Sequence, residues 1–491
     1  MPICRQMRHA LLFLALAISL LVTYDADAQI GGGGRAEPAP AAKAETRVRR
    51  ASRPTVRRTA PKRTAPASKT AEQMQAEADK FFDADDHDSA LAAYEGAVKI
   101  KPLFRSFYRI GWIYNEFEEY EKALVALKRA AQLEPTSAAT HLELGYAHRR
   151  LRQNDLAITA LKRAVSLNPR SPISTYELGA LYNDLQRYQE AAAMLKQATA
   201  NKPDNSEAWE ELGFSQRKLN LNQDAIASFN RAISLDPKNS GAYLGLGDVY
   251  HYGTKNYRDS ITAYQQGLRY GGENHIAAHN IAYGHNELGN YAEAVRWADA
   301  AVKMKSDYYQ AYSEAGYAQY KLGKSDAAIA AYQNAVRLKP DHAVSLFGLG
   351  DVYFDLTKNY QLALFNYTKG LEISPYNKTA LYRSGWAYNH FRQYQEAANV
   401  LFRLIGTDAS QAHYHQELGY SYWQLGRTAE AMTTLNRAIS LNRDQAVAHY
   451  YLGQIYVAQE NRTAAVNAHR ELQRLNSQYA APLLEKINAM R

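Results

Sequence analysis

The sequence predicts an all-α fold: a solenoid of about twelve helix-turn-helix repeats. The first observation is a glycine series with a constant interval, because Gly111, Gly145, Gly179, Gly213 and Gly247 are each 34 residues apart. The second is that large apolar residues recur at helical spacing between small ones, which is the pattern of amphipathic helices. Self-similarity at a period of 20 to 50 residues is typical of repeat architectures, so the length of 491 residues does not imply several globular domains.

Small residues and prolines mark each repeat at fixed places. The glycine series continues at intervals of 34 or 35 as Ala282, Gly316, Gly350, Gly385, Gly419 and Gly453. Alanines follow twelve residues after most of these positions, and further small residues follow seven residues later: Ala123, Ala157, Ala191, Ala225, Ala294, Ala328, Ala397, Ala431 and Ala465, then Ala130, Ala164, Ala198, Ala232, Ala301, Ala335 and Ala438. Proline closes many units, where it ends the second helix because it has no amide hydrogen to donate: Pro102, Pro135, Pro169, Pro203, Pro237, Pro340 and Pro375.

This arrangement of small, large and proline positions resembles the tetratricopeptide repeat family. The resemblance covers residues 71 to about 479, and it implies a right-handed superhelix of helical hairpins. The units are expected to start near residues 71, 104, 138, 172, 206, 240, 275, 309, 343, 378, 412 and 446, with a capping helix over residues 480–491. The first unit is the weakest match, because Ala78 stands where the glycine is expected.

Residues 1–28 have the three parts of a secretory signal peptide. Arg5 and Arg8 precede an apolar run over residues 10–22, and Ala26 and Ala28 stand before the expected cleavage point. The sequence therefore predicts export to the periplasm or the extracellular space, with cleavage favoured because the apolar run is short for spanning a bilayer and an uncleaved signal anchor as the alternative. Cys4 is the only cysteine and would leave with the signal peptide, so disulfides, cysteine-bound zinc and a cysteine nucleophile are excluded for the mature chain.

Residues 29–70 are expected to be a disordered basic arm rich in Ala, Pro and Arg. Eleven Lys and Arg against two Glu give the arm a charge of +9, which is the charge of the whole chain, so residues 71–491 balance at zero. Specific nucleic-acid binding by the repeats is therefore not expected. The arm at residues 35–69 is expected either to contact an anionic surface or to serve as a solvated tether.

The family resemblance implies that the first helix of each hairpin lines a concave groove through positions 2, 5, 9, 12 and 13 of the unit. Aromatic residues at such positions suit an extended peptide or stacked sugar rings, although the same rings could simply pack against the adjoining hairpin. The candidate ligand-binding residues are Tyr108, Trp112, Tyr146, Tyr176, Phe214, Asp248, Tyr283, Tyr317, Phe347, Asp351, Tyr382, Trp386 and Tyr420.

A block of three hairpins is predicted to have been copied. Residues 245–260 and 348–363 are identical at 10 of 16 places, at an offset of 103 that the following units keep. Asp248 and Asp351 then occupy equivalent points of the groove, either as a duplicated ligand site or as a copied structural feature. The family members that clamp chaperone tails carry Lys or Arg at position 5 and Asn at position 9. No unit of this sequence has these residues at those positions, so a chaperone-tail receptor is disfavoured.

No enzymatic motif occurs in a suitable context, so no catalytic residue and no cofactor are predicted. His275 and His279 have the i, i+4 spacing of metal ligands but lack an evident third ligand, so no metal site is predicted. The leading hypothesis is a non-enzymatic scaffold that binds an extended segment of a protein partner in the groove. The alternatives are a polysaccharide-binding or export accessory protein, and an envelope-tethered adaptor that acts through its basic arm.

Overall fold

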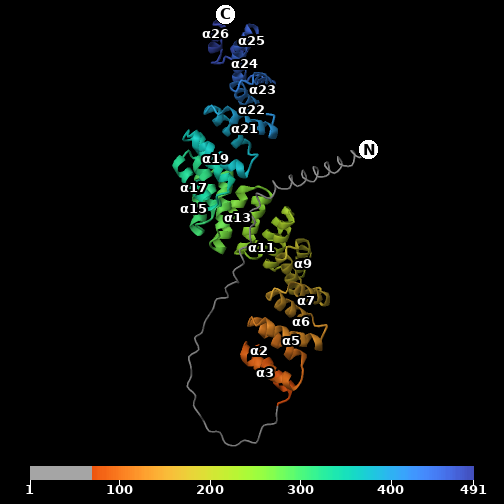
Figure 1. Ribbon diagram of the computed structural model, residues 1–491. Helices are drawn as coiled ribbons and strands as arrows, with labels where there is room; N and C mark the ends of the chain where they lie inside the picture. Colours follow the sequence, from red (N-terminus) through yellow and green to blue (C-terminus); the bar gives the residue numbers. More distant parts are fainter. Residues whose placement is uncertain (1–68, 491) are drawn as a thin grey trace, which may run out of the picture. The chain divides into compact units, whose positions relative to one another are not determined.

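The structure is a computed structural model that describes residues 69–490. The chain divides into residues 1–70 and 71–491, and the second unit is considered by itself. The predicted signal peptide and all but the last two residues of the predicted arm lie outside the described residues. The described residues form helical hairpins that follow one another in chain order, so the predicted all-α solenoid is confirmed (Figure 1). Among the described residues no helix is long and apolar enough to cross a membrane.

Each hairpin has a first and a second helix. The first helices are α2 (Ala71–Asp83), α4 (Phe104–Glu116), α6 (Ala138–Arg150), α8 (Pro172–Asp184), α10 (Ser206–Lys218), α12 (Ser240–Asp248), α14 (His275–Glu287), α16 (Tyr309–Lys321), α18 (Ala343–Asp355), α20 (Lys378–His390), α22 (Ala412–Gln424) and α24 (Ala446–Ala458). The second helices are α3 (His87–Ile100), α5 (Tyr120–Leu133), α7 (Asn154–Leu167), α9 (Tyr188–Asn201), α11 (Asn222–Leu235), α13 (Tyr257–Gly271), α15 (Tyr291–Met304), α17 (Ser325–Leu338), α19 (Tyr360–Ile373), α21 (Tyr394–Thr407), α23 (Thr428–Leu441) and α25 (Arg462–Arg474). One π-helical turn, η1 (Val249–Gly253), extends α12, and α26 (Ala480–Asn488) packs on the last hairpin.

Local chemistry explains where these helices begin and turn. Several first helices start after a side chain that accepts a hydrogen bond from the third helical amide, as Ser137, Asn205 and Asn377 do. The tight turn between the two helices of a hairpin places one residue in the left-handed region. That residue is glycine at Gly289 and Gly426, where the absence of Cβ removes the strain of this conformation.

The recurring glycine of the first helix is required by close packing inside the hairpin. A Cβ on Gly111 would lie 2.4 Å from Cγ of Leu127 on α5, and one on Gly350 would lie 2.4 Å from Cε1 of Tyr367 on α19. A substitution would therefore push the two helices apart. The recurring alanines, such as Ala123, are fully buried at the same crossing.

The hairpins stack in two layers that differ in spacing. First helices of neighbouring hairpins contact each other directly, as α14 and α16 do, whereas second helices of neighbouring hairpins are linked mainly through the first helix between them. The first helices therefore form the inner layer, as the family resemblance implies. We call its surface the first-helix face and the opposite surface the second-helix face.

Candidate binding face

Aromatic residues at position 9 of the first helices contact a ring of the preceding hairpin. For every aromatic residue at this position except Trp112, the partner ring is the first residue of the preceding second helix, 26 residues earlier in the chain. Ring centroids are 6.3 Å apart for Tyr120 and Tyr146 and 4.9 Å apart for Tyr360 and Trp386. Each contact joins two neighbouring hairpins. The further pairs are Tyr188 with Phe214, Tyr257 with Tyr283, Tyr291 with Tyr317, and Tyr394 with Tyr420.

Position 9 is not aromatic where the preceding second helix begins with a small or amide side chain. Asn154, Asn222, Ser325 and Thr428 begin such helices, and the residues 26 positions later are Ala180, Asp248, Asp351 and Gln454. The interval of 26 could have been found in the sequence. It shows that the position 9 rings are packed in pairs, and they nevertheless keep part of their surface exposed.

The two groove tryptophans are held by larger aromatic clusters. Trp112 has edge contacts with Phe82 and His87, at centroid distances of 5.1 and 5.5 Å. Trp386 contacts Phe354 and lies parallel to His390, with ring planes 10° apart. Both indoles are partly buried by these neighbours.

Tyr108 and Tyr382, which precede the two tryptophans by four residues, contact other neighbours. Tyr108 stacks on Phe104 at 6.2 Å, and Tyr382 contacts His413 at 4.8 Å. Tyr176 packs against a core cluster that is built from α7, α8, α9 and α10, and this burial raises the pKa of its phenol. Phe347 points toward α19, because its ring occupies the space over Gly370. The predicted aromatic residues are therefore only partly turned to the outside of the first-helix face.

A polar ladder, which the sequence reasoning missed, runs between first helices. Asn115 donates from Nδ2 to Oε2 of Glu143 at 2.7 Å and to its carbonyl oxygen at 3.2 Å. The asparagine is at position 12 and the glutamate at position 6 of the next unit. An interval of 28 residues separates them, which is the signal that could have revealed the ladder. The same pair of bonds joins Asn183 with Glu211, Asn286 with Glu314, and Asn389 with Glu417.

The rungs of the ladder differ in whether Oδ1 of the asparagine accepts a hydrogen bond. Ser215 and Ser421 donate at 2.8 Å to Oδ1 of Asn183 and Asn389. Ala147 and Ala318 occupy the corresponding positions on the other two rungs. There, Oδ1 of Asn115 and of Asn286 is buried without a hydrogen-bond partner among the described residues, and such an orphaned acceptor carries a desolvation cost.

Burial in this ladder changes the acidity of its carboxyl groups. Burial raises the pKa of Glu143 and of Glu314 to about 7, against the donation from the asparagine, which lowers it. Burial also raises the pKa of Glu417. A further rung is an ion pair, because Arg149 at position 12 binds Glu177 at 2.7 Å.

Asp248 is part of a polar cluster of three hairpins. Tyr264 donates to its Oδ1 at 2.7 Å, and Arg217 of the preceding hairpin lies 3.3 Å from its Oδ2. Asn280 of the following hairpin donates to the Tyr264 hydroxyl at 2.9 Å and accepts from Tyr252 at 3.0 Å. Burial raises the pKa of Asp248, and the arginine opposes this shift.

Asp351 has the same tyrosine but a different cation. Tyr367 donates to its Oδ1 at 2.7 Å, and Arg383 of the following hairpin donates to the same oxygen at 2.6 Å. The guanidinium also binds Asp355 at 2.9 Å, and Tyr320 donates to that carboxylate at 2.5 Å. The structure thus places both predicted aspartates in networks between hairpins, with their charges paired.

His275 and His279 share an aromatic partner, because both rings contact Tyr308, at 4.8 and 5.4 Å. In residues 69–490, no three His, Cys, Asp or Glu side chains group in an arrangement that could hold a metal ion.

The first-helix face also carries exposed apolar side chains. Tyr252 and Tyr317 are 51% and 38% exposed, and Ile173 and Val344 at position 2 are exposed as well. These residues are exposed apolar points of the face, and Tyr317 is at the same time one of the paired position 9 rings.

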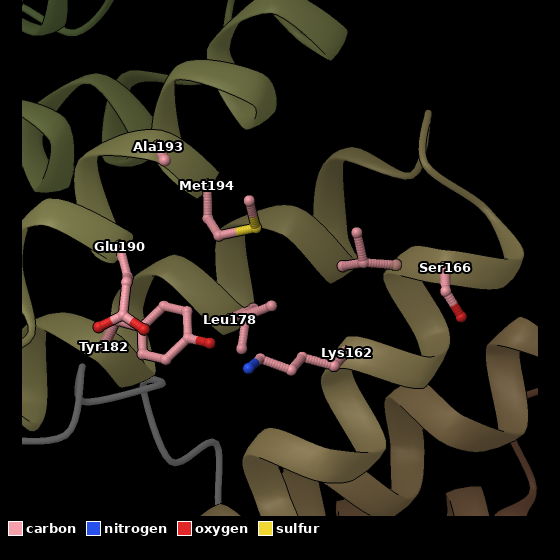
Figure 2. A pocket seen from close by; sticks show the side chains of 8 residues that line it. Lys162, Ser166, Leu178, Tyr182, Glu190, Ala193 and Met194 are labelled. Carbon is pink, nitrogen blue, oxygen red and sulfur yellow. The ribbon is translucent and has the colours of Figure 1, made fainter.

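Two hollows lie on the second-helix face, away from the predicted groove. One, of about 320 Å³, opens between α7 and α9 over α8, with Leu178, Tyr182 and Met194 inside and Lys162 and Glu190 at its edge (Figure 2). The other, of about 530 Å³, is lined by the residues 34 positions later and by Pro203 and Trp209. Both follow from the wider spacing of the second helices.

Comparison with known proteins identifies the repeat. Models described as tetratricopeptide repeat match residues 104–137, 142–206, 181–240, 249–309 and 313–378, and a model described as TPR repeat matches residues 419–460.

Curated relatives match over parts of their length. Small glutamine-rich tetratricopeptide repeat-containing protein 2 of Saccharomyces cerevisiae is 32% identical over 89 residues, which is 18% of this chain and 26% of that protein. Anaphase-promoting complex subunit 3 of Schizosaccharomyces pombe is 21% identical over 176 residues, which is 36% of this chain and 26% of that protein. Protein O-mannosyl-transferase TMTC3 of Homo sapiens is 26% identical over 159 residues, which is 32% of this chain and 17% of that protein. The chain thus spans about a quarter or less of these relatives.

Among solved structures, YrrB, a TPR protein with an unusual peptide-binding site, is 22% identical, with a TM-score of 0.36 over 39% of this chain and 97% of that one. The Cut9–Hcn1 hetero-tetramer matches at 15% identity and a TM-score of 0.36, over 86% of this chain and 97% of that one.

Proposed function

The chain belongs to the tetratricopeptide repeat family, whose members generally mediate protein–protein interactions, and from this premise we propose that it is a non-enzymatic scaffold that binds an extended segment of a protein partner on its first-helix face.

The paired rings at position 9 are the observation that carries this proposal. Each ring is held at one edge by a ring of the preceding hairpin and keeps another part of its surface exposed, as Tyr146 and Tyr420 do. A ring that is already fixed loses little conformational entropy when it contacts a ligand. Aromatic side chains with a polar tip also suit the mixed surface of a peptide. A series of such rings on successive hairpins favours a partner segment in an extended conformation.

The charges of this face support recognition of a peptide segment over a charged terminus. Asp248 and Asp351 are each paired with an arginine, and the ladder carboxylates of Glu143 and Glu314 accept from asparagine. A strongly charged end group would find few unpaired countercharges here. The apolar points at Ile173, Tyr317 and Val344 would receive apolar side chains of the segment.

Selection of peptides from a random display library against the whole chain tests the proposal. Peptides that bind the first-helix face are expected to lose about tenfold in affinity for Tyr317→Ala and for Ile173→Ser, since both side chains are exposed contact points. Val125→Ser on α5 is the control, because Val125 is exposed on the second-helix face. Peptides that bind all three variants like the wild type, or that fail only with the control, would overturn the proposal.

We also propose that the chain is exported, on the basis of the signal-peptide pattern in residues 1–28. Expression of the whole chain with a C-terminal tag in its native source, followed by fractionation and N-terminal sequencing, tests this. A tagged product that is found in the cytoplasm and keeps Cys4 would contradict export.

A further inference from the structure

The two hollows on the second-helix face have the same construction in neighbouring hairpins. Each is lined by a lysine of one second helix, a leucine of the first helix beneath it and an alanine of the next second helix: Lys162, Leu178 and Ala193 in the first hollow, and Lys196, Leu212 and Ala227 in the second. Helix α9 forms the wall between them, because Ala193 lines one hollow and Lys196 the other. We call this tandem pair the outer hollows.

The outer hollows are apolar inside and large enough for a side chain. Leu178 and Leu212 lie at their floors and are each 2% exposed, and Met194 and Trp209 belong to the walls. The volumes of about 320 and 530 Å³ fall in the range of about 300–1,000 Å³ that is typical of ligand pockets. Each hollow therefore has room for one large apolar side chain of a ligand.

The spacing of the outer hollows favours a helical ligand. Because they lie on either side of α9, their centres are about one helix diameter, roughly 10–12 Å, apart. Side chains seven residues apart on an α-helix share a face and are separated by about 10.5 Å. In an extended segment, three residues cover about 10 Å but point the two side chains to opposite faces, and four residues cover about 13 Å. One helix can thus place a side chain in both hollows.

The first outer hollow has one positive charge in excess among its lining residues and the groups bonded to them. Lys162 of α7 and Glu190 of α9 extend from opposite sides of the hollow (Figure 2). Glu190 accepts a hydrogen bond from Nε of Arg187 at 2.7 Å, so its charge is already paired. Lys162 forms no ion pair within residues 69–490.

The second outer hollow has the same excess. Lys196 stands at one edge, and Arg231 donates from Nη2 to the carbonyl oxygen of Pro203, which lines the hollow, at 3.4 Å. Asp224 is the carboxylate among the lining residues. Neither cation forms an ion pair in the described part of the chain. A ligand that carries carboxylates beside its apolar side chains would therefore be favoured at both hollows.

The lysine at the edge of the outer hollows belongs to the first part of the array. Lys128 of α5 holds the same position one hairpin before Lys162. The next seven hairpins after Lys196 have no basic residue there: Asn230, then Gln265, Asp299 and Gln333 in the first copied block (the first copy, residues 240–342), and Thr368, Phe402 and Asn436 in the second (the second copy, residues 343–445). The charge is thus not part of the general repeat pattern.

We propose that the outer hollows bind an acidic amphipathic helix of a protein partner. Two apolar side chains of this helix, seven residues apart, enter the hollows, and its carboxylates face Lys162 and Lys196. The site goes beyond the function proposed above, because it lies on the second-helix face and leaves the first-helix face open for another segment.

A displayed library of helical peptides tests the proposal. Leucine or phenylalanine is fixed at two places seven residues apart, the other surface positions are randomised, and peptides are selected against the whole chain. The selected peptides are expected to be rich in Asp and Glu. They should lose at least about tenfold in affinity for Ala193→Trp and for Ala227→Trp, since both changes fill a hollow. Ala330→Trp is the control, because Ala330 is exposed at the equivalent place on α17.

A charge change tests the second half of the proposal. Lys162→Glu combined with Lys196→Glu should weaken the same peptides by about tenfold or more, and Lys in place of their Asp and Glu should recover part of the loss. Tyr317→Ala should leave them bound, so a failure here is distinct from a failure of the first-helix face. Circular dichroism of each variant checks that the helices are retained.

Three results would overturn the proposal. The first is a selection whose peptides all bind the filled variants Ala193→Trp and Ala227→Trp like the wild type. The second is that the peptides sensitive to filling carry a net positive charge. The third is that a single-stranded DNA oligonucleotide displaces the peptides and binds the filled variants as well as the wild type, because the surface would then recognise polyanions by charge alone.

Discussion

The two copied blocks pair equivalent carboxylates with arginines from opposite neighbouring hairpins. In the first copy Asp248 is paired with Arg217 of the preceding hairpin, and in the second copy Asp351 is paired with Arg383 of the following one. The offset of 103 aligns Arg217 with Tyr320, and Asn280 with Arg383. The cation has therefore changed sides, while the bond from Tyr264 or Tyr367 is kept at 2.7 Å in both copies.

This exchange shows what the fold requires at that point. A partly buried carboxylate needs a positive partner, but the partner can come from either neighbouring hairpin, because both first helices adjoin the aspartate. The second copy adds Asp355 where the first has Tyr252, so its arginine balances two carboxylates. A repeat array can thus change its polar contacts while its helix packing stays the same.

The largest expected effect comes from removal of Arg383. Arg383→Leu leaves Asp351 and Asp355 without a cation, so the free energy of unfolding should fall by about 3 kcal/mol. Arg217→Leu should cost less, about 1–2 kcal/mol, because only one carboxylate loses its partner. Urea unfolding followed by tryptophan fluorescence measures both.

A reconstruction of the first-copy arrangement sharpens this test. Tyr320→Arg with Asp355→Tyr and Arg383→Asn gives the second copy the residues of the first, and it should recover most of the stability lost in Arg383→Leu. Equal losses for the two single variants would contradict a contribution from the second carboxylate. A reconstruction as unstable as Arg383→Leu would show that the cation is not interchangeable between hairpins.

The second prediction concerns His251, which the second copy replaces with Phe354. Burial lowers the pKa of His251 to about 4, with His279 adding to the shift, and its Nδ1 is buried without a hydrogen-bond partner among the described residues. The folded protein then binds fewer protons than the unfolded chain between pH 4 and 6.5, so this group lowers stability as the pH falls through that range.

The free energy of unfolding of His251→Phe should therefore exceed that of the wild type by about 2 kcal/mol at pH 4 and by much less at pH 8. The difference between the two proteins is the quantity to measure, by urea unfolding across pH 4–8, since every other titrating group contributes to both. A difference that does not change with pH would contradict a buried neutral histidine.

The third prediction exchanges a single hydroxyl between the copies. Ser421 satisfies Oδ1 of Asn389, whereas Ala318 leaves Oδ1 of Asn286 without a partner among the described residues. Ser421→Ala should lower the free energy of unfolding by about 1 kcal/mol, and Ala318→Ser should raise it by a similar or smaller amount. Ser384→Ala is the control, because the Ser384 hydroxyl is likewise buried without a partner in the described part of the chain. Ser421→Ala and Ser384→Ala with equal effects would rule out the hydrogen bond as the cause.

The sequence predicted the hairpins well because their packing depends on residue size at fixed intervals. Gly111 and Ala123 recur wherever two helices cross, and this requirement is the same in every repeat. The side-chain contacts were harder to predict, since they join different repeats. The intervals of 26 for Tyr120 with Tyr146 and of 28 for Asn115 with Glu143 do not coincide with the period of 34.

Other features of the face have no signal in a single sequence. The exchange of the cation between Arg217 and Arg383 depends on which neighbouring side chain reaches the carboxylate, and only the structure shows this. The assignment of Phe347 to the groove followed from its position in the unit, but its ring turns toward Gly370. Whether the candidate residues bind a ligand stays a prediction.

The smallest expected effect concerns a feature that both copies share. Tyr291 with Tyr317 and Tyr394 with Tyr420 are equivalent ring pairs, with centroids 6.3 and 6.0 Å apart. Double-mutant cycles with leucine should give a coupling of about 0.5–1 kcal/mol for each pair, as edge-to-face rings do. Because the geometry is conserved between the copies, the two values should agree. A coupling near zero in both would mean that the rings are not fixed before a ligand arrives, which would remove the entropic advantage on which the proposed peptide binding rests.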